Sequence, residues 1–140
     1  MKDWENPVAG TLFGKETMIK ILVCGGRDYD DQDSLTRSLS KICAERGYWN
    51  DGHPNCMIIS GLARGADTLA LYWAKDLVLP TMQFPANWDK YGKSAGAIRN
   101  TQMLKVGQPD LVVAFPGGRG TDHMKSIARA AGVEVIQVDA

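Results

Sequence analysis

One stretch of the chain constrains the fold more than any other, because it joins a buried strand to a helix through a glycine-rich turn. Residues 111–115, Leu-Val-Val-Ala-Phe, are five consecutive apolar residues. Such a run is typical of a strand that is covered on both faces, as in a parallel sheet. Pro116 is expected to end the strand, because proline has no backbone N–H to donate. The stretch therefore indicates an α/β protein.

The turn after this strand has the features of a phosphate cradle. Gly117, Gly118 and Gly120 are expected to allow positive φ angles and close approach of a ligand to the backbone. Thr121 is expected to cap a helix with one apolar face, formed by Met124, Ile127, Ala128 and Ala131. A helix N-terminus that follows such a turn directs free N–H groups and the positive end of its dipole at one point, which suits a phosphate. The alternative is a tight turn without a ligand.

The rest of the chain alternates strand patterns with helical patterns. Helical patterns follow each of the first four strands, and the strands are predicted at residues 19–24, 56–60, 79–84, 110–115 and 134–138. This alternation predicts a doubly wound parallel sheet with right-handed crossovers.

Three segments lie outside this pattern. Residues 48–55 are expected to form a polar loop, and residues 85–94 a longer loop of the kind that often serves as a lid or a binding loop. Residues 1–17 are interpreted as an N-terminal extension, or alternatively as an arm that packs on the body or on a second subunit. The core domain is then residues 18–140.

Composition restricts the functions to consider. The chain has 140 residues, enough for one domain, and its 16 Lys and Arg balance its 16 Asp and Glu. There is thus no global field to attract nucleic acid or an anionic membrane. Cys24, Cys43 and Cys56 are scattered and are interpreted as buried free thiols in a reducing compartment. With no apolar run of membrane-spanning length and no signal-peptide pattern, the chain is predicted to be cytoplasmic.

The unusual polar and glycine residues all follow predicted strand ends. In an open α/β sheet, ligands bind outside the carboxyl ends of the strands, where the strand order reverses. The candidate ligand-binding residues are Gly25, Gly26, Arg27 and Asp28 after the first strand, Ser60, Gly61, Arg64, Gly65 and Asp67 after the second, Arg99 in the helix after the third, and Pro116, Gly117, Gly118, Arg119, Gly120 and Thr121 after the fourth.

Charged and aromatic side chains in these turns have two interpretations each. Arg99 and Arg119 are expected to contact a phosphate, whereas Arg27 and Arg64 either do the same or pair with a nearby aspartate. Trp88, Tyr91 and Lys93 either close over a base or plug the underside of the loop. His123, in the first turn of a helix, is expected to face solvent, with contact to a phosphate as the alternative.

No metal or cofactor is required by the sequence. Asp28, Asp30 and Asp31 offer carboxylates to Mg²⁺, but they lack a fixed ligand spacing and are interpreted as a solvated acidic turn. The two histidines, His53 and His123, are distant in the sequence and cannot build a metal site alone.

Four segments together resemble a known group of proteins. They are Gly-Gly-Arg-Asp at 25–28, Ser-Gly-Leu-Ala-Arg-Gly-Ala-Asp at 60–67, Ala-Gly-Ala-Ile-Arg-Asn at 95–100 and Pro-Gly-Gly-Arg-Gly-Thr at 116–121. Over residues 18–140 this combination resembles the SLOG superfamily, and within it the YspA-type (YpsA-related) family of bacteria and phages. The superfamily also includes DprA and the LOG-type phosphoribohydrolases. The resemblance implies a Rossmann-like sheet of order 3-2-1-4-5, a nucleotide or nucleotide-derived ligand, and a homo-oligomer that is a dimer or larger.

The resemblance also raises an enzymatic alternative. LOG-type enzymes cleave the N-glycosidic bond of nucleoside 5′-monophosphates with a PGGxGTxxE motif and an upstream arginine. The arginine matches Arg99, but the glutamate position is Met124. Asp122 is the neighbouring candidate carboxylate, although a helix turns by about 100° per residue, so it does not replace that glutamate simply. Arg99 and Asp122 are the candidate catalytic residues, with Asp28 and Asp67 as further carboxylates. Asp67 is expected in the first turn of its helix, so the alternative is that it only stabilises the helix dipole.

Three hypotheses therefore follow from the sequence. The first is a nucleotide-binding domain, the second is a phosphoribohydrolase, and the third is a DprA-like module for single-stranded DNA. The balanced charge and the lack of an aromatic and basic stripe in the sequence disfavour nucleic acid as a partner.

Overall fold

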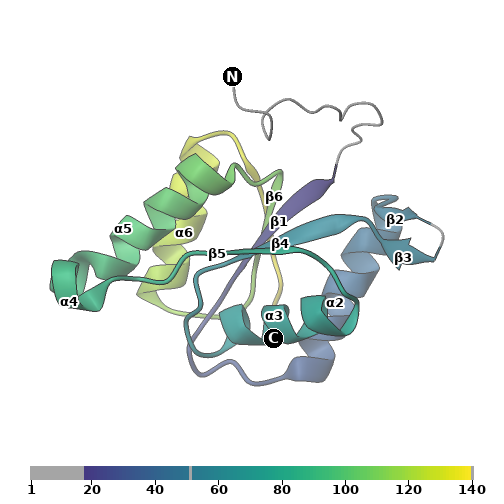
Figure 1. Ribbon diagram of the computed structural model, residues 1–140, viewed down its shortest axis with the longest axis horizontal. Coiled ribbons are helices and arrows are strands. Elements are labelled where there is room, and N and C mark those ends of the chain that lie inside the picture. Colours follow the sequence, from purple (N-terminus) through teal and green to yellow (C-terminus); the bar gives the residue numbers. More distant parts are fainter. Residues whose placement is uncertain (1–17, 51, 140) are drawn as a thin grey trace.

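A computed structural model describes residues 18–50 and 52–139 as a parallel sheet between two layers of helices (Figure 1). The predicted extension, residues 1–17, lies outside the described residues. The strands are β1 (Ile19–Cys24), β2 (Trp49–Asn50), β3 (His53–Pro54), β4 (Cys56–Ser60), β5 (Thr81–Gln83), β6 (Leu111–Ala114) and β7 (Glu134–Gln137). The helices are α2 (Gln32–Glu45), α3 (Ala66–Asp76), α4 (Trp88–Tyr91), α5 (Ala95–Gln102) and α6 (Arg119–Ala130).

The main sheet has the order β5-β4-β1-β6-β7, and all of its pairs are parallel. When only these five strands are counted along the chain, the order is 3-2-1-4-5, which agrees with the expected topology. The predicted fold class is confirmed. The order of the strands reverses between β1 and β6, so the turns after these two strands flank the crevice in which such sheets bind ligands.

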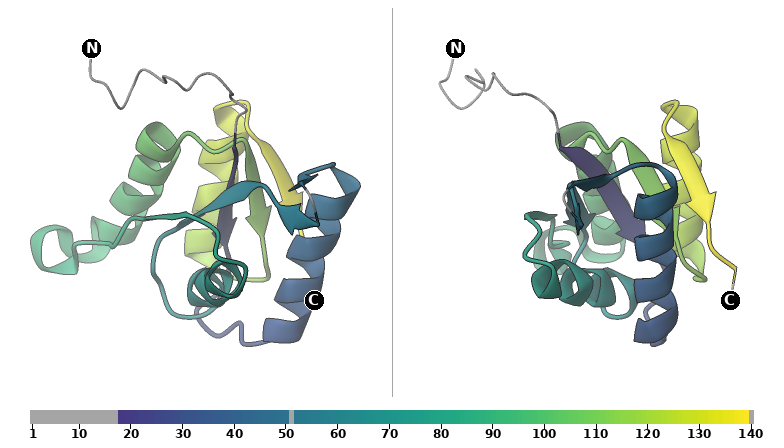
Figure 2. Two further views of the ribbon diagram at one scale, coloured as in Figure 1. Left: turned by 45° about the vertical axis from the view of Figure 1, so that its right-hand side comes forward. Right: turned by 90° about the vertical axis from the view of Figure 1, so that its right-hand side faces the viewer.

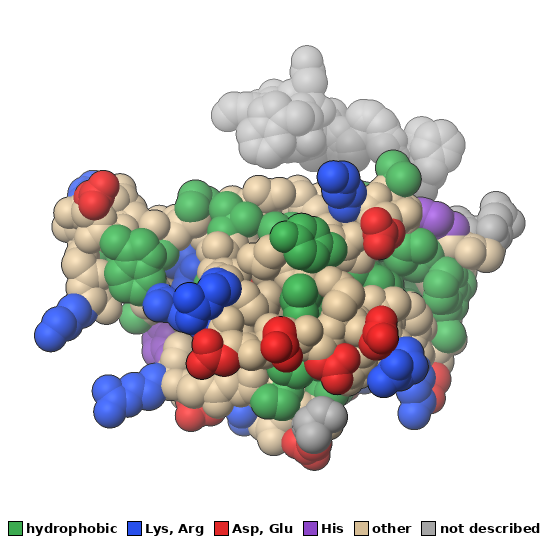
Figure 3. Space-filling model, turned by 90° about the horizontal axis from the view of Figure 1, so that it is seen from below, with side chains coloured by type: hydrophobic (Ala, Val, Ile, Leu, Met, Phe, Trp, Pro, Cys, Tyr) green, Lys and Arg blue, Asp and Glu red, His purple; other side chains and the backbone are tan. Residues whose placement is uncertain are grey.

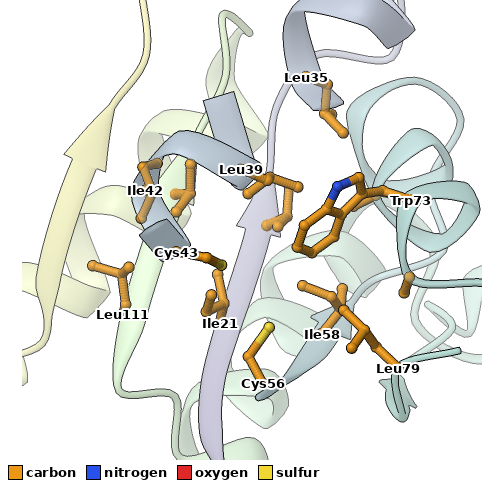
Figure 4. Packing of buried hydrophobic residues seen from close by; sticks show 14 of the residues in the cluster. Ile21, Leu35, Leu39, Ile42, Cys43, Cys56, Ile58, Trp73, Leu79 and Leu111 are labelled. Carbon is orange, nitrogen blue, oxygen red and sulfur yellow. The ribbon is translucent and has the colours of Figure 1, made fainter. Parts of the chain in front are cut away.

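The two faces of the sheet bury separate cores. Ile21 and Val23 of β1 pack with residues of α2 and α3, whereas Leu22 and Cys24 pack with Met103 and residues of α6. Figure 2 shows helices on both faces of the sheet. Figure 4 shows the first core, in which Trp73 of α3 packs with residues of α2 and β4. All four residues of β6 are buried, as expected for a central parallel strand.

Two predicted loops contain regular structure. Residues 48–55 include the antiparallel hairpin β2–β3, because Trp49 and its neighbour Tyr48 pack against the first core and hold the segment in place. Residues 85–94 include α4, whose first turn is capped by Asn87: its Oδ1 accepts from the Lys90 N–H at 3.0 Å. Neither element was predicted from the composition of the loops. The hairpin depends on contacts with the first core, and α4 depends on the cap by Asn87.

Other differences concern the ends of elements. β5, the third strand of the sheet in chain order, is Thr81–Gln83 and is shorter than the predicted 79–84, since Pro80 precedes it. At its C-terminal end, α5 continues into a π-helical turn at Met103–Gly107. The cysteines Cys24, Cys43 and Cys56 are buried and unbonded, as predicted. Among the described residues, no helix is both long and apolar enough to cross a membrane.

Candidate functional site

The turns after β1, β4 and β6 interlock at one rim of the sheet. The Gly26 N–H donates to the Pro116 carbonyl at 2.8 Å, and the Gly26 carbonyl accepts from the Ala66 N–H at 3.2 Å. The first turn is thus bonded on one side to the turn after β6 and on the other to the start of α3. The structure therefore brings together three segments that are far apart in the sequence.

One set of glycines makes this interlocking sterically feasible. Gly65 has a φ of +88°, and a Cβ there would overlap the Gly26 carbonyl oxygen. A Cβ on Gly25 would lie 2.6 Å from the Ala66 Cβ, and one on Gly117 would overlap the Thr121 hydroxyl. Because real Cβ atoms do not approach other atoms so closely, these glycines serve the packing of turn against turn.

A second set of glycines faces open space. A Cβ on Gly118 or on Gly120 would meet no atom within 4 Å. The expectation of positive φ angles in this turn is wrong: Gly117, Gly118 and Gly120 are not among the residues with positive φ, and Gly118 has a φ of −110°. These two glycines therefore matter for the surface they leave uncovered rather than for an unusual backbone conformation.

The helix that follows begins earlier than predicted. Gly118, not Thr121, is the N-cap of α6, and no side chain caps this end of the helix among the described residues. The first intrahelical bond runs from the Asp122 N–H to the Gly118 carbonyl at 2.9 Å. The N–H groups of the preceding residues have no intrahelical acceptor and carry the positive end of the helix dipole.

A cavity of about 600 Å³, here called the rim cavity, lies between these turns and α5. Its volume is within the range of small-molecule sites. The candidate binding residues that line it are Gly25, Gly26, Arg27, Asp67, Arg99, Gly118, Arg119, Gly120 and Thr121.

The other candidates lie outside the rim cavity. Gly61 and Arg64 line a neighbouring hollow, whereas Asp28, Ser60, Gly65, Pro116 and Gly117 line neither. The buried Ser60 hydroxyl donates to the Asp67 carbonyl at 3.1 Å and accepts from the Leu62 N–H at 3.1 Å, so it holds the second turn. Its position indicates a structural role.

The segment after β5 contributes an aromatic wall. Trp88 of α4 and Lys93 both line the rim cavity, and the Arg27 guanidinium carbon lies 5.4 Å from the centre of the Trp88 ring. Tyr91 lies outside the lining, with the Lys90 ammonium 5.1 Å from its ring centre. Of the three side chains expected either to close over a base or to plug the loop, Trp88 and Lys93 are thus placed beside the cavity.

Arg99 and Asn100 tie α5 to the two turns that face it. The half-buried Arg99 donates to the Gly61 carbonyl at 2.6 Å and to the Asn100 Oδ1 at 3.0 Å. The Asn100 amide donates to the Gly120 carbonyl at 3.2 Å and lies 3.1 Å from the His123 Nδ1. Burial lowers the pKa of the Arg99 guanidinium, and the charge of Asp67 opposes this shift.

Sequence reasoning did not select Asn100 as a site residue and expected His123 to face solvent. Both line the rim cavity, and Asn100 is only 5% exposed. The available signal was the Arg99-Asn100 pair itself, because a buried asparagine beside an arginine needs polar partners.

Asp67 is the carboxylate that lines the rim cavity. It is 5% exposed, and its Oδ2 accepts from the Ala63 N–H at 3.3 Å. Burial raises the pKa of Asp67 to about 6, although Arg99 and the backbone donors oppose the shift. Burial also raises the pKa of the neighbouring Cys24 thiol to about 12. The cavity wall therefore holds one acid that titrates close to neutral pH and one thiol that stays protonated.

Because the pKa of Asp67 is raised in the folded protein, the free energy of unfolding should depend on pH. The folded protein binds this proton more tightly than the unfolded chain, because the pKa rises from an ordinary 3.8 to about 6. The stabilisation by the neutral acid is complete below about pH 4 and is lost as the pH rises through 6. Asp67→Asn is therefore expected to raise the free energy of unfolding by about 1–3 kcal/mol at pH 7.5. Urea denaturation at a series of pH values measures this difference, which should shrink towards pH 4.5; a pH-independent difference would contradict a raised pKa.

Asp122, the other candidate catalytic residue, lies outside the rim cavity. The Asp122 side chain is 70% exposed, and its carboxylate lies 3.4 Å from the Lys125 ammonium, outside the cavity lining. Met124, at the position of the LOG-type glutamate, is fully buried in the second core. Of the two candidate catalytic residues, only Arg99 is thus placed in the rim cavity. In the part of the chain that the structure describes, no group of three or more His, Cys, Asp or Glu could hold a metal ion.

Comparisons with known proteins agree with this architecture. A model of the YspA, cpYpsA-related SLOG family matches residues 19–91, which include the first two turns and Trp88. The Gene 61 protein of Mycobacterium phage D29 is 33% identical over 127 residues, covering 85% of this chain and 95% of that protein. The X-ray structure of DNA processing protein A (DprA) from Streptococcus pneumoniae superposes with a TM-score of 0.62 at 20% identity, over 86% of this chain and 50% of that chain. The chain thus spans about half the length of DprA, with which it shares the fold.

Proposed function

The chain belongs to the YspA, cpYpsA-related SLOG family, and from this premise we propose that it binds a nucleotide or a nucleotide-derived ligand in the rim cavity. Family and fold together indicate a nucleotide-related or DNA-processing role. The proposal of a small ligand goes further and is carried by one observation: an uncapped helix N-terminus opens into the rim cavity beside two unobstructed glycines.

The phosphate of the ligand belongs at the start of α6. The free N–H groups of the first turn and the helix dipole favour an anion at this point. Gly118 and Gly120 leave room for phosphate oxygens to approach the backbone. Arg119 lines the cavity at the same place and adds a positive charge.

The base and sugar belong further along the cavity, towards α4. Trp88 is 48% exposed and lines the cavity, so its ring offers a surface for stacking. Arg27 and Lys93 lie in the same lining. The cavity therefore combines an anion site at one end with an aromatic and cationic wall, which is the set of contacts that a nucleotide needs.

Removal of Arg99 tests whether its charge serves the ligand. Arg99→Ala is expected to weaken nucleotide binding by about 1.5–3 kcal/mol. Arg99 lines the rim cavity and bonds to Asn100 beside the start of α6, from where it is expected to donate a charged hydrogen bond to the phosphate. Isothermal titration calorimetry measures this change. Arg129→Ala, at an exposed position near the other end of α6, is the matched control and should bind as the unchanged protein does. Equal affinities of the two variants would assign Arg99 a purely structural role.

A thermal screen tests the function itself. The protein is heated in the presence of each of the common nucleoside 5′-monophosphates, and one of them at about 100 times its Kd should add about 2.7 kcal/mol of stability. A salt-dependent gel shift of a single-stranded oligonucleotide, with no stabilisation by any mononucleotide, would contradict the proposal and favour a DprA-like role.

The position of Asp67 favours a second candidate function, the hydrolysis of a nucleoside 5′-monophosphate. In this reaction a water oxygen bonds to C1′ of the ribose, the C1′–N bond breaks, and the base leaves with that electron pair and a proton. Asp67 and Arg99 line the same cavity, so a carboxylate is available to stabilise the developing cation or to take the proton of water. Release of free base, measured by chromatography, would support this function. The Asp67→Asn variant should release no base.

We also propose that the protein is a homo-oligomer located in the cytoplasm. Both features are implied by the resemblance to the family, and sedimentation and cell fractionation measure them directly.

A further inference from the structure

A second hollow, here called the side cavity, adjoins the rim cavity and has a volume of about 370 Å³. Arg27, Ala63, Trp88 and Arg99 line both cavities, so these residues form the wall between them. The side cavity is itself within the size range of small-ligand sites. A mononucleotide with its phosphate at α6 and its base at Trp88 accounts for the rim cavity and leaves the side cavity unused.

Arg64 lines the side cavity but not the rim cavity, and its guanidinium makes two contacts. The Arg64 Nε donates to the Arg27 carbonyl at 3.2 Å, and its Nη2 donates to the Asp28 Oδ1 at 3.2 Å. The pair with Asp28 is weak as a source of stability, because the two side chains are 75% and 97% exposed. Asp28 is therefore an exposed carboxylate that an anion in the side cavity can replace as the partner of the Arg64 guanidinium.

Within residues 18–50 and 52–139, the other two arginines of the side cavity are not in direct contact with a carboxylate. Among the ion pairs of the described residues, none includes Arg27 or Arg99. Figure 3 looks onto the rim where the strands end, and shows Lys and Arg gathered towards the end that carries α4, beside a row of acidic side chains. Three guanidinium groups around one hollow are suited to an anion such as phosphate, which they bind in a bidentate manner.

The backbone beside the side cavity is held in an unusual conformation. Leu62 lines the cavity with a φ of 61°, which is rare for a residue other than glycine, and its side chain is 39% exposed. Such strain costs about 1–3 kcal/mol and persists where the surrounding structure enforces it, often at ligand sites. The Ser60 hydroxyl accepts from the Leu62 N–H at 3.1 Å, a contact that is compatible with this conformation.

We infer that the side cavity is a second anion subsite, and hence that the ligand carries two separated phosphate groups. The first phosphate lies at the N-terminus of α6 and the second lies among Arg27, Arg64 and Arg99. This inference rests on the proposed nucleotide site. A nucleoside bisphosphate and a 5′-phosphorylated dinucleotide both supply the second phosphate.

Calorimetry with three adenosine compounds tests the subsite. The probes are adenosine 5′-monophosphate, adenosine 3′,5′-bisphosphate and the 5′-phosphorylated dinucleotide pApA. At least one of the two probes that carry a second phosphate should bind at least about 10-fold more tightly than the monophosphate. This difference in affinity corresponds to about 1.4 kcal/mol. Tighter binding of the bisphosphate identifies a second phosphate on one nucleoside, and tighter binding of pApA alone identifies a dinucleotide.

Two variants with opposite effects sharpen the test. Arg64→Ala should remove the gain from the second phosphate and leave monophosphate binding unchanged, whereas Asp28→Asn should increase the gain by removing a competing carboxylate. Arg37→Ala, at an exposed position of α2, is the control and should change neither. Equal binding of all three probes, unaffected by Arg64→Ala, would overturn the inference but keep the nucleotide site. Absence of binding by any probe would instead contradict the nucleotide site.

Discussion

The Gly120→Val protein is expected to lose at least about 100-fold in affinity for a nucleoside 5′-monophosphate, or about 2.7 kcal/mol, while it folds normally. A Cβ at this position meets no protein atom within 4 Å, and the position lines the rim cavity. The added Cβ would therefore extend into the space assigned to the phosphate without contact with a protein atom. Because valine has a higher helix propensity than glycine, α6 should not be weakened.

Calorimetry and thermal denaturation together check this expectation. Ala130→Val adds apolar bulk at an exposed position near the C-terminal end of the same helix and is the matched control, with unchanged binding. The Gly120→Val protein should melt within about 3 °C of the parent, since its effect on stability is below about 0.5 kcal/mol. Retained affinity in a folded Gly120→Val protein would show that the phosphate does not lie at α6.

Gly65→Ala is expected to destabilise the fold by about 3 kcal/mol or more. Its φ of +88° is unfavourable for alanine, and the new Cβ would overlap the Gly26 carbonyl oxygen and lie 2.7 Å from the Arg27 carbonyl carbon. The turns after β1 and β4 would then have to separate, which breaks the hydrogen bond from the Ala66 N–H to the Gly26 carbonyl.

Urea denaturation measures this loss, with Gly120→Ala as the control. The control residue is also a glycine at the rim, but it lies in a helix and faces open space, so alanine should stabilise the protein by about 0.5–1 kcal/mol. Opposite signs for the two substitutions would confirm that the rim contains packing glycines and open glycines. A similar small effect at both positions would contradict the division.

The sheet and the location of the rim were predictable, because they depend on features that repeat along the chain. The apolar run of residues 111–114 identified a central strand, and the alternation of strands and helices identified a parallel sheet. In such a sheet all strands end at the same rim, so the turns at 25–28, 60–67 and 116–121 had to come close together.

The roles of individual residues at the rim were not predictable, because they depend on contacts between turns. Gly65 and Gly118 look alike in the sequence, yet one packs against backbone and the other faces open space. Asp67 and Asp122 are both in the first turn of a helix, but only Asp67 is turned into the cavity wall. The orientation of a helix about its axis, which tertiary packing sets, decides between them.

The proposed function depends above all on the amide groups at the start of α6, which are proposed to bind the phosphate of the ligand. Amide chemical shifts of the ¹⁵N-labelled protein, followed during titration with inorganic phosphate at constant ionic strength, test it most directly. The Gly118, Arg119 and Gly120 amides should show saturable shifts, which are absent when chloride replaces phosphate. Saturable shifts confined to other parts of the protein, or no saturation at these three amides, would contradict it.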